Sequence, residues 1–421
     1  MPLNDLERRV CEHIESRAAE IYANLDTCVM IPTGRDHVAG LDLYRKMLAT
    51  RLAALGAKIE QRPGQARPDW MRLPGARDES NAVHPILIAT HAPGGGKKSS
   101  GDRDSRGDKA GQHPRILLAG HLDTVHDPHG DFQRLTPLPD GVRAAGPGAA
   151  DMKGGIEVGV AALESLHHCG VELPWSFILN SDEETGSFQS EHALRDLAGK
   201  HDVGVALEPA LPGGALAIER MGSGQFRIDV FGRSAHVGRD FANGVSAVHR
   251  LAEIIAQLDK LSRPDAGMIV NVGPLQGGKA TNVVADHAAC WGNVRFATPE
   301  AGEMLAKAID ALATSPDAMP RVEVRRAWAR PAKPFTPQVE QLALDLRAAA
   351  TDLGQELPFA RTGGVCDGNI LQDAGLPTLD TLGVRGGNLH RTDEFMEIPS
   401  LVERAKLLAV WLMRVERMND G

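Results

Sequence analysis

The sequence has few cysteines and few aromatic residues, and positive charge is not in excess. Its five cysteines form an odd, scattered set: Cys11, Cys28, Cys169, Cys290 and Cys366. A set of this kind is typical of a reducing compartment and not of a disulfide framework, so we expect a cytoplasmic protein. The formal net charge is −9, and no basic patch interleaved with aromatic residues offsets it. This argues against nucleic acid as a main partner.

Long hydrophobic runs are also missing. The longest apolar stretches have the length of a strand and not the roughly 20 residues of a membrane helix, so no membrane span is expected. The N-terminal residues lack a basic segment followed by an apolar one, so no signal peptide is expected either. With 421 residues, 42% hydrophobic and 24% charged, the chain has the composition of a soluble globular protein of about two or three domains.

Strand and helix patterns alternate along most of the chain. Apolar residues at helical spacing predict helices over about 6–21 and 41–55. A further helix is expected after Asp151, with the inward face Ile156, Val160, Leu163 and His167. Apolar runs predict strands at 57–60, 83–90, 116–125, 175–180, 203–207 and 377–382. This alternation predicts an α/β fold with a mostly parallel sheet flanked by helices.

A different pattern occupies the middle of the chain. From about 218 to 329, the order strand, helix, strand, strand, helix, strand predicts an inserted, ferredoxin-like α+β unit with helices on one face of an antiparallel sheet. The predicted stripe of its first helix is Val245, Val248, Leu251, Ile255 and Leu258. We therefore expect one domain from 1–212 plus 331–421 and a second from 213–330. Residues 92–113 are rich in Gly, Ser and alternating charge, which predicts a disordered surface insertion.

Several predicted strands end in an acid or a histidine. His121 ends the first of them, with Asp123 two positions on, so one ring nitrogen could bind a metal while Asp123 orients the ring. Later strands lead into Glu183 and Glu184 and into Glu208. Because ligands gather beyond the carboxyl ends of the strands in such sheets, we expect these side chains to lie together.

Two further residues complete this set. Asp151 lies in a turn-rich segment before a predicted helix, and His390 follows a late glycine-rich turn. Two histidines and three carboxylates suit zinc, although cobalt or manganese could take the same ligands. Five ligands suit two metals about 3.5–4 Å apart that share one carboxylate. The alternatives are that Asp151 only caps its helix and that residues 182–184 are a solvated charged run. His126 and His129 are expected to be bystanders in a loop.

Five motifs resemble, in order, those of the di-zinc metallopeptidase and deacylase family. That family includes the carboxypeptidase G-type glutamate carboxypeptidases, acetylornithine deacetylase and succinyl-diaminopimelate desuccinylase. The motifs are G-H-L-D-T-V, G-P-G-A-A-D-M-K-G-G, S-D-E-E-T-G-S, E-P and G-G-N-L-H-R-T-D-E. The resemblance covers nearly the whole chain apart from the Gly/Ser insertion. It implies a zinc-peptidase-like catalytic domain with two zinc ions in each subunit.

The resemblance also implies a role for each candidate residue. Glu183 would be the general base, and Asp123 would orient the first histidine. Asp151 would bridge the two metals. The remaining ligands divide into two pairs, His121 with Glu208 and Glu184 with His390.

The inserted domain would be a lid that also forms the contact of a homodimer. His236 matches a lid histidine that stabilises the developing oxyanion from the partner subunit. Arg330, Asn282 and the turn Gly363–Gly364 match residues that bind a free substrate carboxylate, a group that an arginine fork fits. Two alternatives remain open, a surface structural role for His236 and a lid-to-body salt bridge for Arg330.

The expected function is therefore hydrolysis of an amide bond next to an amino acid with a free carboxylate, as in a carboxypeptidase. A first alternative is an N-acyl-amino-acid deacylase, such as acetylornithine deacetylase or succinyl-diaminopimelate desuccinylase. A second is a non-catalytic metal-dependent binding protein. The substrate is expected to be a small acylated amino acid or a short peptide. The acyl group, the amino acid, the metal used in the cell and the pathway are left open by the sequence.

Overall fold

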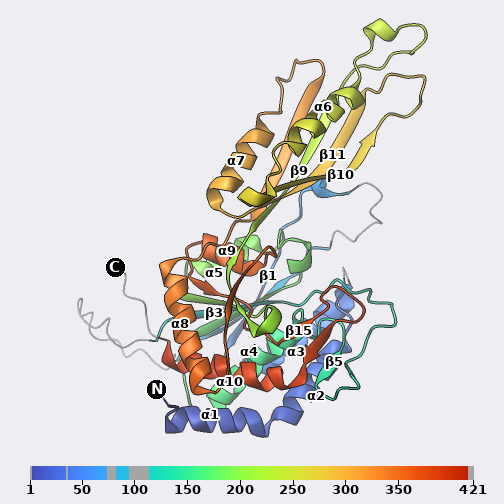
Figure 1. The fold of residues 1–421 in the computed structure, drawn as a ribbon. Helices are drawn as coiled ribbons and strands as arrows, with labels where there is room; N and C mark the ends of the chain where they lie inside the picture. The colour runs from blue at the N-terminus through green and yellow to red at the C-terminus, as the bar shows by residue number, and fades with distance from the viewer. Residues whose placement is uncertain (1, 35–36, 74–81, 94–112, 416–421) are drawn as a thin grey trace, which may run out of the picture.

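The computed structural model describes residues 2–34, 37–73, 82–93 and 113–415. Most of the predicted 92–113 insertion therefore lies outside the described residues. Figure 1 shows a large lower body, to which the first and last helices belong, and a smaller elongated upper body built from the middle of the chain. Within the described ranges, no helix has both the length and the apolar character needed to cross a membrane.

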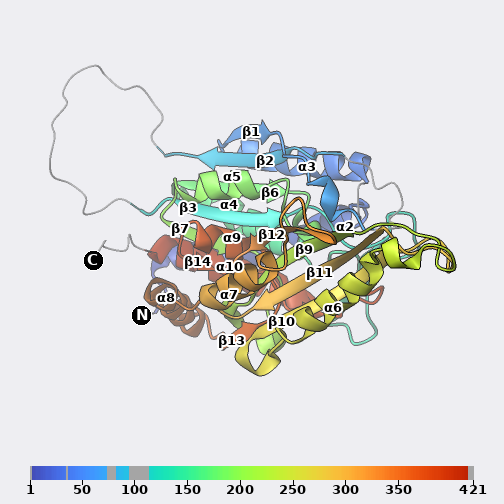
Figure 2. The same ribbon diagram turned by 90° about the horizontal axis from the view of Figure 1, so that it is seen from above.

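The large body contains a six-stranded sheet in which most strands are parallel. Its strands are β1 (Lys58–Arg62), β2 (Ile86–His91), β6 (Trp175–Asn180), β3 (Ile116–His121), β7 (Val203–Ala206) and β14 (Thr378–Leu379), in that order. Figure 2 shows β1, β2, β6, β3 and β7 side by side. The strands β6, β3, β7 and β14 are mutually parallel, whereas β2 is antiparallel to both neighbours. The predicted α/β fold with a mostly parallel sheet is confirmed.

Alternate residues of the central strands face two different cores. Phe177 and Leu179 point into the larger core, while Ile178 points into the smaller one. The smaller core is covered by α5 (Glu191–Ala198) and α9 (Asp367–Asp373). The larger core is covered by α1 (Asp5–Ser16), α2 (Ala18–Val29), α3 (Val38–Ala54), α4 (Lys153–His168), α8 (Pro337–Asp352) and α10 (Ile398–Arg414). Because helices cover both faces, every residue of β3, β6 and β7 is buried, including the polar Ser176 and Asn180.

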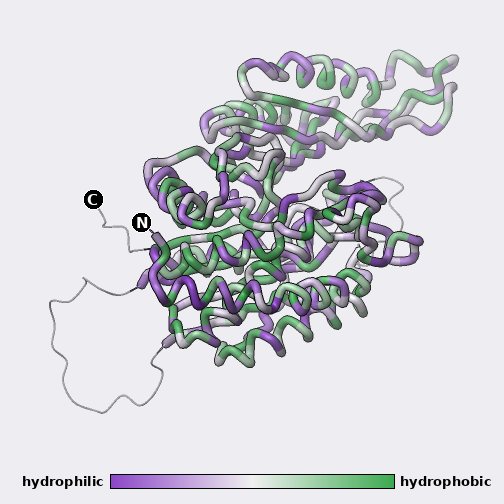
Figure 3. The backbone as a smooth tube through the Cα atoms, turned by 60° about the horizontal axis from the view of Figure 1, so that its bottom comes forward, coloured by the Kyte–Doolittle hydropathy of each residue, from purple (hydrophilic) through white to green (hydrophobic). Residues whose placement is uncertain are grey.

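The helices differ from their predictions in two places. The expected helix 6–21 is two helices, which meet at Arg17 with φ −97° and ψ 9°. The predicted inward position of His167 is wrong, because this residue is exposed at the end of α4. Leu166 takes the buried position in that last turn. Figure 3 shows hydrophobic and hydrophilic stretches alternating along the helices, as expected for helices that cover a sheet with one face.

The small body is an antiparallel sheet covered by two helices. The chain order is β9 (Gly222–Phe231), α6 (Ala247–Asp259), β10 (Met268–Gly277), β11 (His287–Phe296), α7 (Pro299–Asp310) and β12 (Arg321–Arg330). The sheet order is β10-β11-β9-β12, and every pairing is antiparallel. The predicted element order and ferredoxin-like arrangement are thus found. We call this body the lid.

The lid has a core of its own, but the stripe of its first helix is not the predicted one. Val245 precedes α6, and Val248 is exposed. The buried face of α6 is instead Ala247, Leu251, Ile254 and Leu258. It packs on Phe226, Ile228 and Val230 of β9, among others. The predicted spacing had begun at Val245, before the cap residue Ser246, and this placed its second position on the exposed Val248.

Two smaller sheets complete the described structure. One pairs β8 (Leu216–Arg220) with β13 (Phe359–Thr362) in parallel. The other has the order β15 (Gly386–Gly387), β16 (Phe395–Glu397), β5 (Arg143–Ala145) and β4 (Thr136–Pro137). Trp291 of the lid donates its indole N–H to the carbonyl oxygen of Trp70, at 3.0 Å, and so ties the lid to the large body.

Candidate active site

His121 stands at the carboxyl end of β3 and is almost completely buried. Its Nδ1 lies 2.9 Å from the backbone oxygen of Asp123 and 3.5 Å from the carboxylate Oδ1 of the same residue. Its Nε2 lies 3.2 Å from Oδ1 of Asp151 and 4.0 Å from Oε1 of Glu208. One ring nitrogen is therefore fixed from behind, while the other faces two carboxylates.

Asp151 lies between two groups of side chains. One of its oxygens, Oδ1, faces His121, which in turn faces Glu208. The other, Oδ2, lies 3.4 Å from Nε2 of His390, and this nitrogen lies 3.4 Å from Oε2 of Glu184. Each oxygen of one carboxylate thus faces a histidine that also approaches a glutamate. All five candidate ligands come together beyond the carboxyl edge of the large sheet, although they are far apart in sequence.

Different local structures deliver these ligands. Glu184 lies in a short 3₁₀ helix that follows β6, and Glu208 follows β7. Asp151 lies in the turn before α4, and His390 lies in the loop between β15 and β16. The backbone of His390 is left-handed, with φ 65°. Such a conformation is uncommon outside glycine, and it is characteristic of turns and functional sites.

The site collects more buried negative charge than its own histidines balance. Burial and the neighbouring Asp151 raise the pKa of Glu184 to about 10. Burial also raises the pKa of Glu208. Burial opposes ionisation of Asp151 as well, but hydrogen bonds from His121 and His390 outweigh it and lower the pKa of Asp151. Buried carboxylates whose pKa is raised in this way are suited to binding cations, which supply the positive charge that stabilises their ionised form. The oxygens and nitrogens present are ligands that zinc accepts.

Asp123 also fixes the segment that carries the two glutamates. Its Oδ2 accepts the backbone N–H of Glu184 at 3.0 Å, and its Oδ1 accepts that of Glu183 at 3.3 Å. The same residue therefore touches the imidazole of His121 and the 3₁₀ helix of the acidic motif. The acids at 183 and 184 are held in place and are not a solvated run, since neither side chain is exposed.

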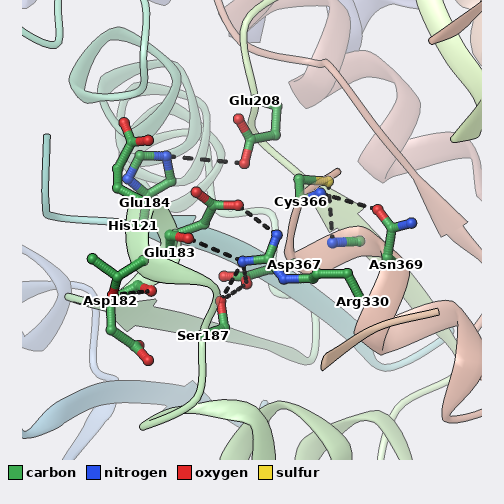
Figure 4. A network of polar contacts seen from close by, with 12 residues as sticks. His121, Asp182, Glu183, Glu184, Ser187, Glu208, Arg330, Cys366, Asp367 and Asn369 are labelled. Carbon is green, nitrogen blue, oxygen red and sulfur yellow. Dashed lines mark hydrogen bonds and ion pairs between the residues drawn. The ribbon is translucent and has the colours of Figure 1, made fainter. Parts of the chain in front are cut away.

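Arg330 brings the lid strand β12 into contact with this segment (Figure 4). Its Nη1 lies 2.7 Å from Oε1 of Glu183, and its Nη2 donates to Oγ of Ser187 at 2.6 Å. The pairing register of β12 shifts between Ala327 and Arg330, and a shift of this kind redirects a side chain. The lid-to-body salt bridge considered for Arg330 is therefore present in the structure. Its side chain is 3% exposed.

His236 and Asn282 lie together on the lid. The N–H of Val237 donates to the backbone oxygen of Asn282, and His236 pairs with Val283 in an isolated bridge. His236 is exposed. The loop that follows it forms the end of the lid farthest from the large body in Figure 1. The contacts of the five candidate ligands given above include neither of these two residues. The turn Gly363–Gly364 follows β13, where a Cβ on Gly364 would lie 3.5 Å from Nη1 of Arg220.

Sequence reasoning missed a buried pair beside Asp151. Glu394 accepts the backbone N–H groups of Ala150 and Asp151 through Oε1, at 2.9 and 3.0 Å. Its Oε2 lies 2.7 Å from Nε2 of His126. The expectation that His126 is a loop bystander is therefore wrong. The available signal was the position of Glu394 four residues after His390, in the same motif.

A model of the peptidase family M20/M25/M40 matches residues 117–414. Carboxypeptidase G2 of Pseudomonas sp. (strain RS-16) is 26% identical over 309 residues, which cover 71% of this chain and 73% of that protein. Succinyl-diaminopimelate desuccinylase 2 of Shewanella loihica is 29% identical over 333 residues, covering 71% and 85%. The crystal structure of the YXEP protein of Bacillus subtilis, described as a dinuclear metal binding peptidase from the M20 family, aligns with a TM-score of 0.63. That alignment has 15% identity and covers 95% of this chain and 98% of the other.

Proposed function

This chain belongs to the peptidase family M20/M25/M40, as its motifs predicted, and we propose that it is a two-metal amidohydrolase of carboxypeptidase type. It would cleave an amide bond next to an amino acid whose carboxylate is free. The observation that carries the proposal is the position of Asp151, whose two oxygens each face a histidine paired with a glutamate. Membership of a peptidase family favours an enzyme over the non-catalytic binding protein considered from the sequence.

The metals proposed are two zinc ions in each subunit, with cobalt or manganese as substitutes. One would be held by His121 and Glu208 and the other by Glu184 and His390, with Asp151 shared. In support, His121, Asp151 and Glu184 each place a ligand atom within 4.8 Å of the others, in a charge-rich donor set. Two bound metals would supply a nucleophilic water at neutral pH and would polarise the scissile carbonyl.

Glu183 is proposed as the general base. It would accept a proton from the attacking water as the new C–O bond forms. It would then pass this proton to the nitrogen of the leaving amine as the C–N bond breaks. A transfer of this kind is typically worth about 10²- to 10⁴-fold in rate. In support, the side chain of Glu183 is buried, and burial raises its pKa above that of an exposed glutamate. Asp123 would hold Glu183 and His121 in fixed positions relative to each other.

The substrate is proposed to be an acylated amino acid or a short peptide. Arg330, Asn282 and the turn Gly363–Gly364 would receive its free carboxylate. The similarity to carboxypeptidase G2 supports this choice. The similarity to a succinyl-diaminopimelate desuccinylase favours, as a second candidate, an N-acyl-amino-acid deacylase with the same chemistry.

We further propose a homodimer formed through the lid, in which His236 of one subunit stabilises the oxyanion in its partner. His236 is exposed, and the loop that follows it lies at the end of the lid farthest from the large body (Figure 1), which supports this arrangement. The domain limits proposed are 1–212 plus 331–421 and 213–330. A cytoplasmic location is proposed because each of the five cysteines is free.

The test is a substrate panel on zinc-reconstituted protein. It would compare N-acetyl, N-succinyl and N-glutamyl or peptidyl amino acids. Glu183→Gln should retain both zinc ions, measured by elemental analysis, and lose about 10²- to 10⁴-fold in kcat. Glu191→Gln, a change on the partly exposed helix α5, is the matched control and should stay fully active. Full turnover by Glu183→Gln would contradict its role as base.

A further inference from the structure

The base proposed above is already engaged by another residue. Arg330 directs Nη1 to Oε1 of Glu183 and Nη2 to both the Glu183 backbone oxygen and Oγ of Ser187 (Figure 4). Asp367 also faces this guanidinium, with Oδ1 at 3.4 Å from Nη2. Arg330 therefore serves two buried carboxylates at once. A third carboxylate, from a substrate, cannot join them without strong like-charge repulsion in a region from which water is excluded.

One of the two resident carboxylates is free to leave and the other is not. Asp367 is tied on both oxygens, because Ser187 donates to Oδ1 and Asn180 donates to Oδ2, each at 2.5 Å. The Glu183 carboxylate has Arg330 as its side-chain partner, and it is also attracted to His121 in the candidate metal site. A carboxylate that approaches Arg330 should therefore displace Glu183 and not Asp367. The displaced Glu183 would turn toward the site where a base is needed.

We propose that Glu183 and the free carboxylate of the substrate compete for Arg330, so that substrate binding releases the base from an autoinhibitory ion pair. This inference rests on the proposed function and adds to it a link between recognition and chemistry. A substrate without the carboxylate leaves Glu183 held by Arg330. The preference for a free carboxylate then appears in kcat and not only in KM, because the binding energy of a non-reacting group is used to assemble the catalytic site.

The decisive experiment compares one substrate in two forms, an N-acyl amino acid and the same compound with its carboxylate converted to a primary amide. Arg330→Gln removes the charge that holds Glu183 and that binds the carboxylate. It should lower kcat/KM for the acid about ten- to hundredfold, the value of a charged hydrogen bond. It should raise kcat for the amide severalfold above wild type. Arg326→Gln is the matched control, since Arg326 lies on the same strand and pairs with Asp310 on the lid surface.

Two other outcomes would overturn the proposal. An unchanged rate for the amide would make Arg330 a binding residue alone. An equal fall for acid and amide would make it a structural one. If the wild type hydrolysed neither the acid nor the amide, the proposed function itself would be refuted. Failure of this inference and failure of the proposed function are therefore distinguishable.

A second measurement uses the wild-type protein and does not depend on a folded variant. Acetate is a small carboxylate that can occupy Arg330 without a peptide bond to cleave. Added acetate should activate hydrolysis of the amide form, compared with chloride at the same ionic strength as the control for screening. Activation should be absent in Arg330→Gln. If acetate left the wild-type rate for the amide unchanged or lowered it, the proposed competition for Arg330 would be refuted.

Discussion

Glu394 gives a sharp test of how the candidate metal site is held. This carboxylate is 1% exposed and has no place in the proposed ligand set. It satisfies two backbone N–H groups, of Ala150 and Asp151, and one ring nitrogen of His126. Glu394→Ala leaves these three groups without their shared partner. The backbone next to the shared ligand Asp151 would then lose its anchor, while every proposed ligand stays present.

The magnitude follows from the groups left unpaired. Each buried N–H without an acceptor costs about 1–3 kcal/mol, and breaking a buried ionic or strongly polar pair costs about 3–5 kcal/mol. Because costs within one network are not additive, the largest of them sets the scale, and Glu394→Ala should lower the free energy of unfolding by at least about 3–5 kcal/mol. Glu394→Gln keeps the size and one carbonyl acceptor, so its cost should be about 1–2 kcal/mol. Glu397→Ala, three residues on, removes a partly exposed pair with Arg385 and should cost about 1 kcal/mol or less.

Two assays separate stability from metal binding. Urea unfolding of the metal-free proteins gives the free-energy differences. Zinc titration by calorimetry then gives the affinity of each folded variant, and loss of a supporting residue typically costs about 10- to 100-fold in metal affinity. The expected order of loss is Ala greater than Gln greater than the Glu397→Ala control. A Glu394→Ala protein with unfolding free energy and zinc affinity close to wild type would refute the reasoning.

Two further predictions concern pH and assembly. Burial lowers the pKa of Lys153 from its usual 10.5 to about 8. Between these values the unfolded chain binds more protons than the native one, so this group makes stability rise with pH from about 8 to 10.5, and Lys153→Met should remove that slope in urea unfolding. If the lid forms a dimer, Phe241→Asp, a change at a side chain 61% exposed, should yield monomers in light scattering. Mixing inactive His236→Ala with inactive Glu183→Gln subunits should restore some activity, and no recovery would place His236 in its own subunit or outside the reaction.

The sheet and the ligand positions could be predicted because each depends on a pattern that lies close together in sequence. His121 and Glu208 directly follow apolar runs, Glu184 comes in the acidic segment after another, and parallel strands bring their carboxyl ends to one edge. The lid followed from its element order, which few folds share. Helix faces were predicted less accurately, because a stripe can be started one residue before the cap, as at Val245, so that its next position falls on the exposed Val248.

The supporting contacts could not be predicted in the same way. Glu394 and His126 are 268 residues apart, and Glu394 also binds backbone N–H groups, which leave no mark in a sequence. Arg330 and Glu183 are 147 residues apart. Each had been given a plausible role of its own, and their contact depends on the end of β12, where the pairing register shifts between Ala327 and Arg330. Long-range pairs of this kind depend on how the lid sits on the large body.

The site is organised by carboxylates that are not themselves proposed ligands. Asp123 accepts the N–H groups of Glu183 and Glu184, and Glu394 accepts those of Ala150 and Asp151. In both cases an acid fixes the backbone next to a proposed ligand without using any ligand atom. The two segments are therefore positioned by the protein alone. Metal binding would then not have to order them, which lowers its entropic cost. Glu183 is the exception, since the lid and not the large body holds its carboxylate. The acid proposed to move a proton is thus the one whose partner a substrate would replace.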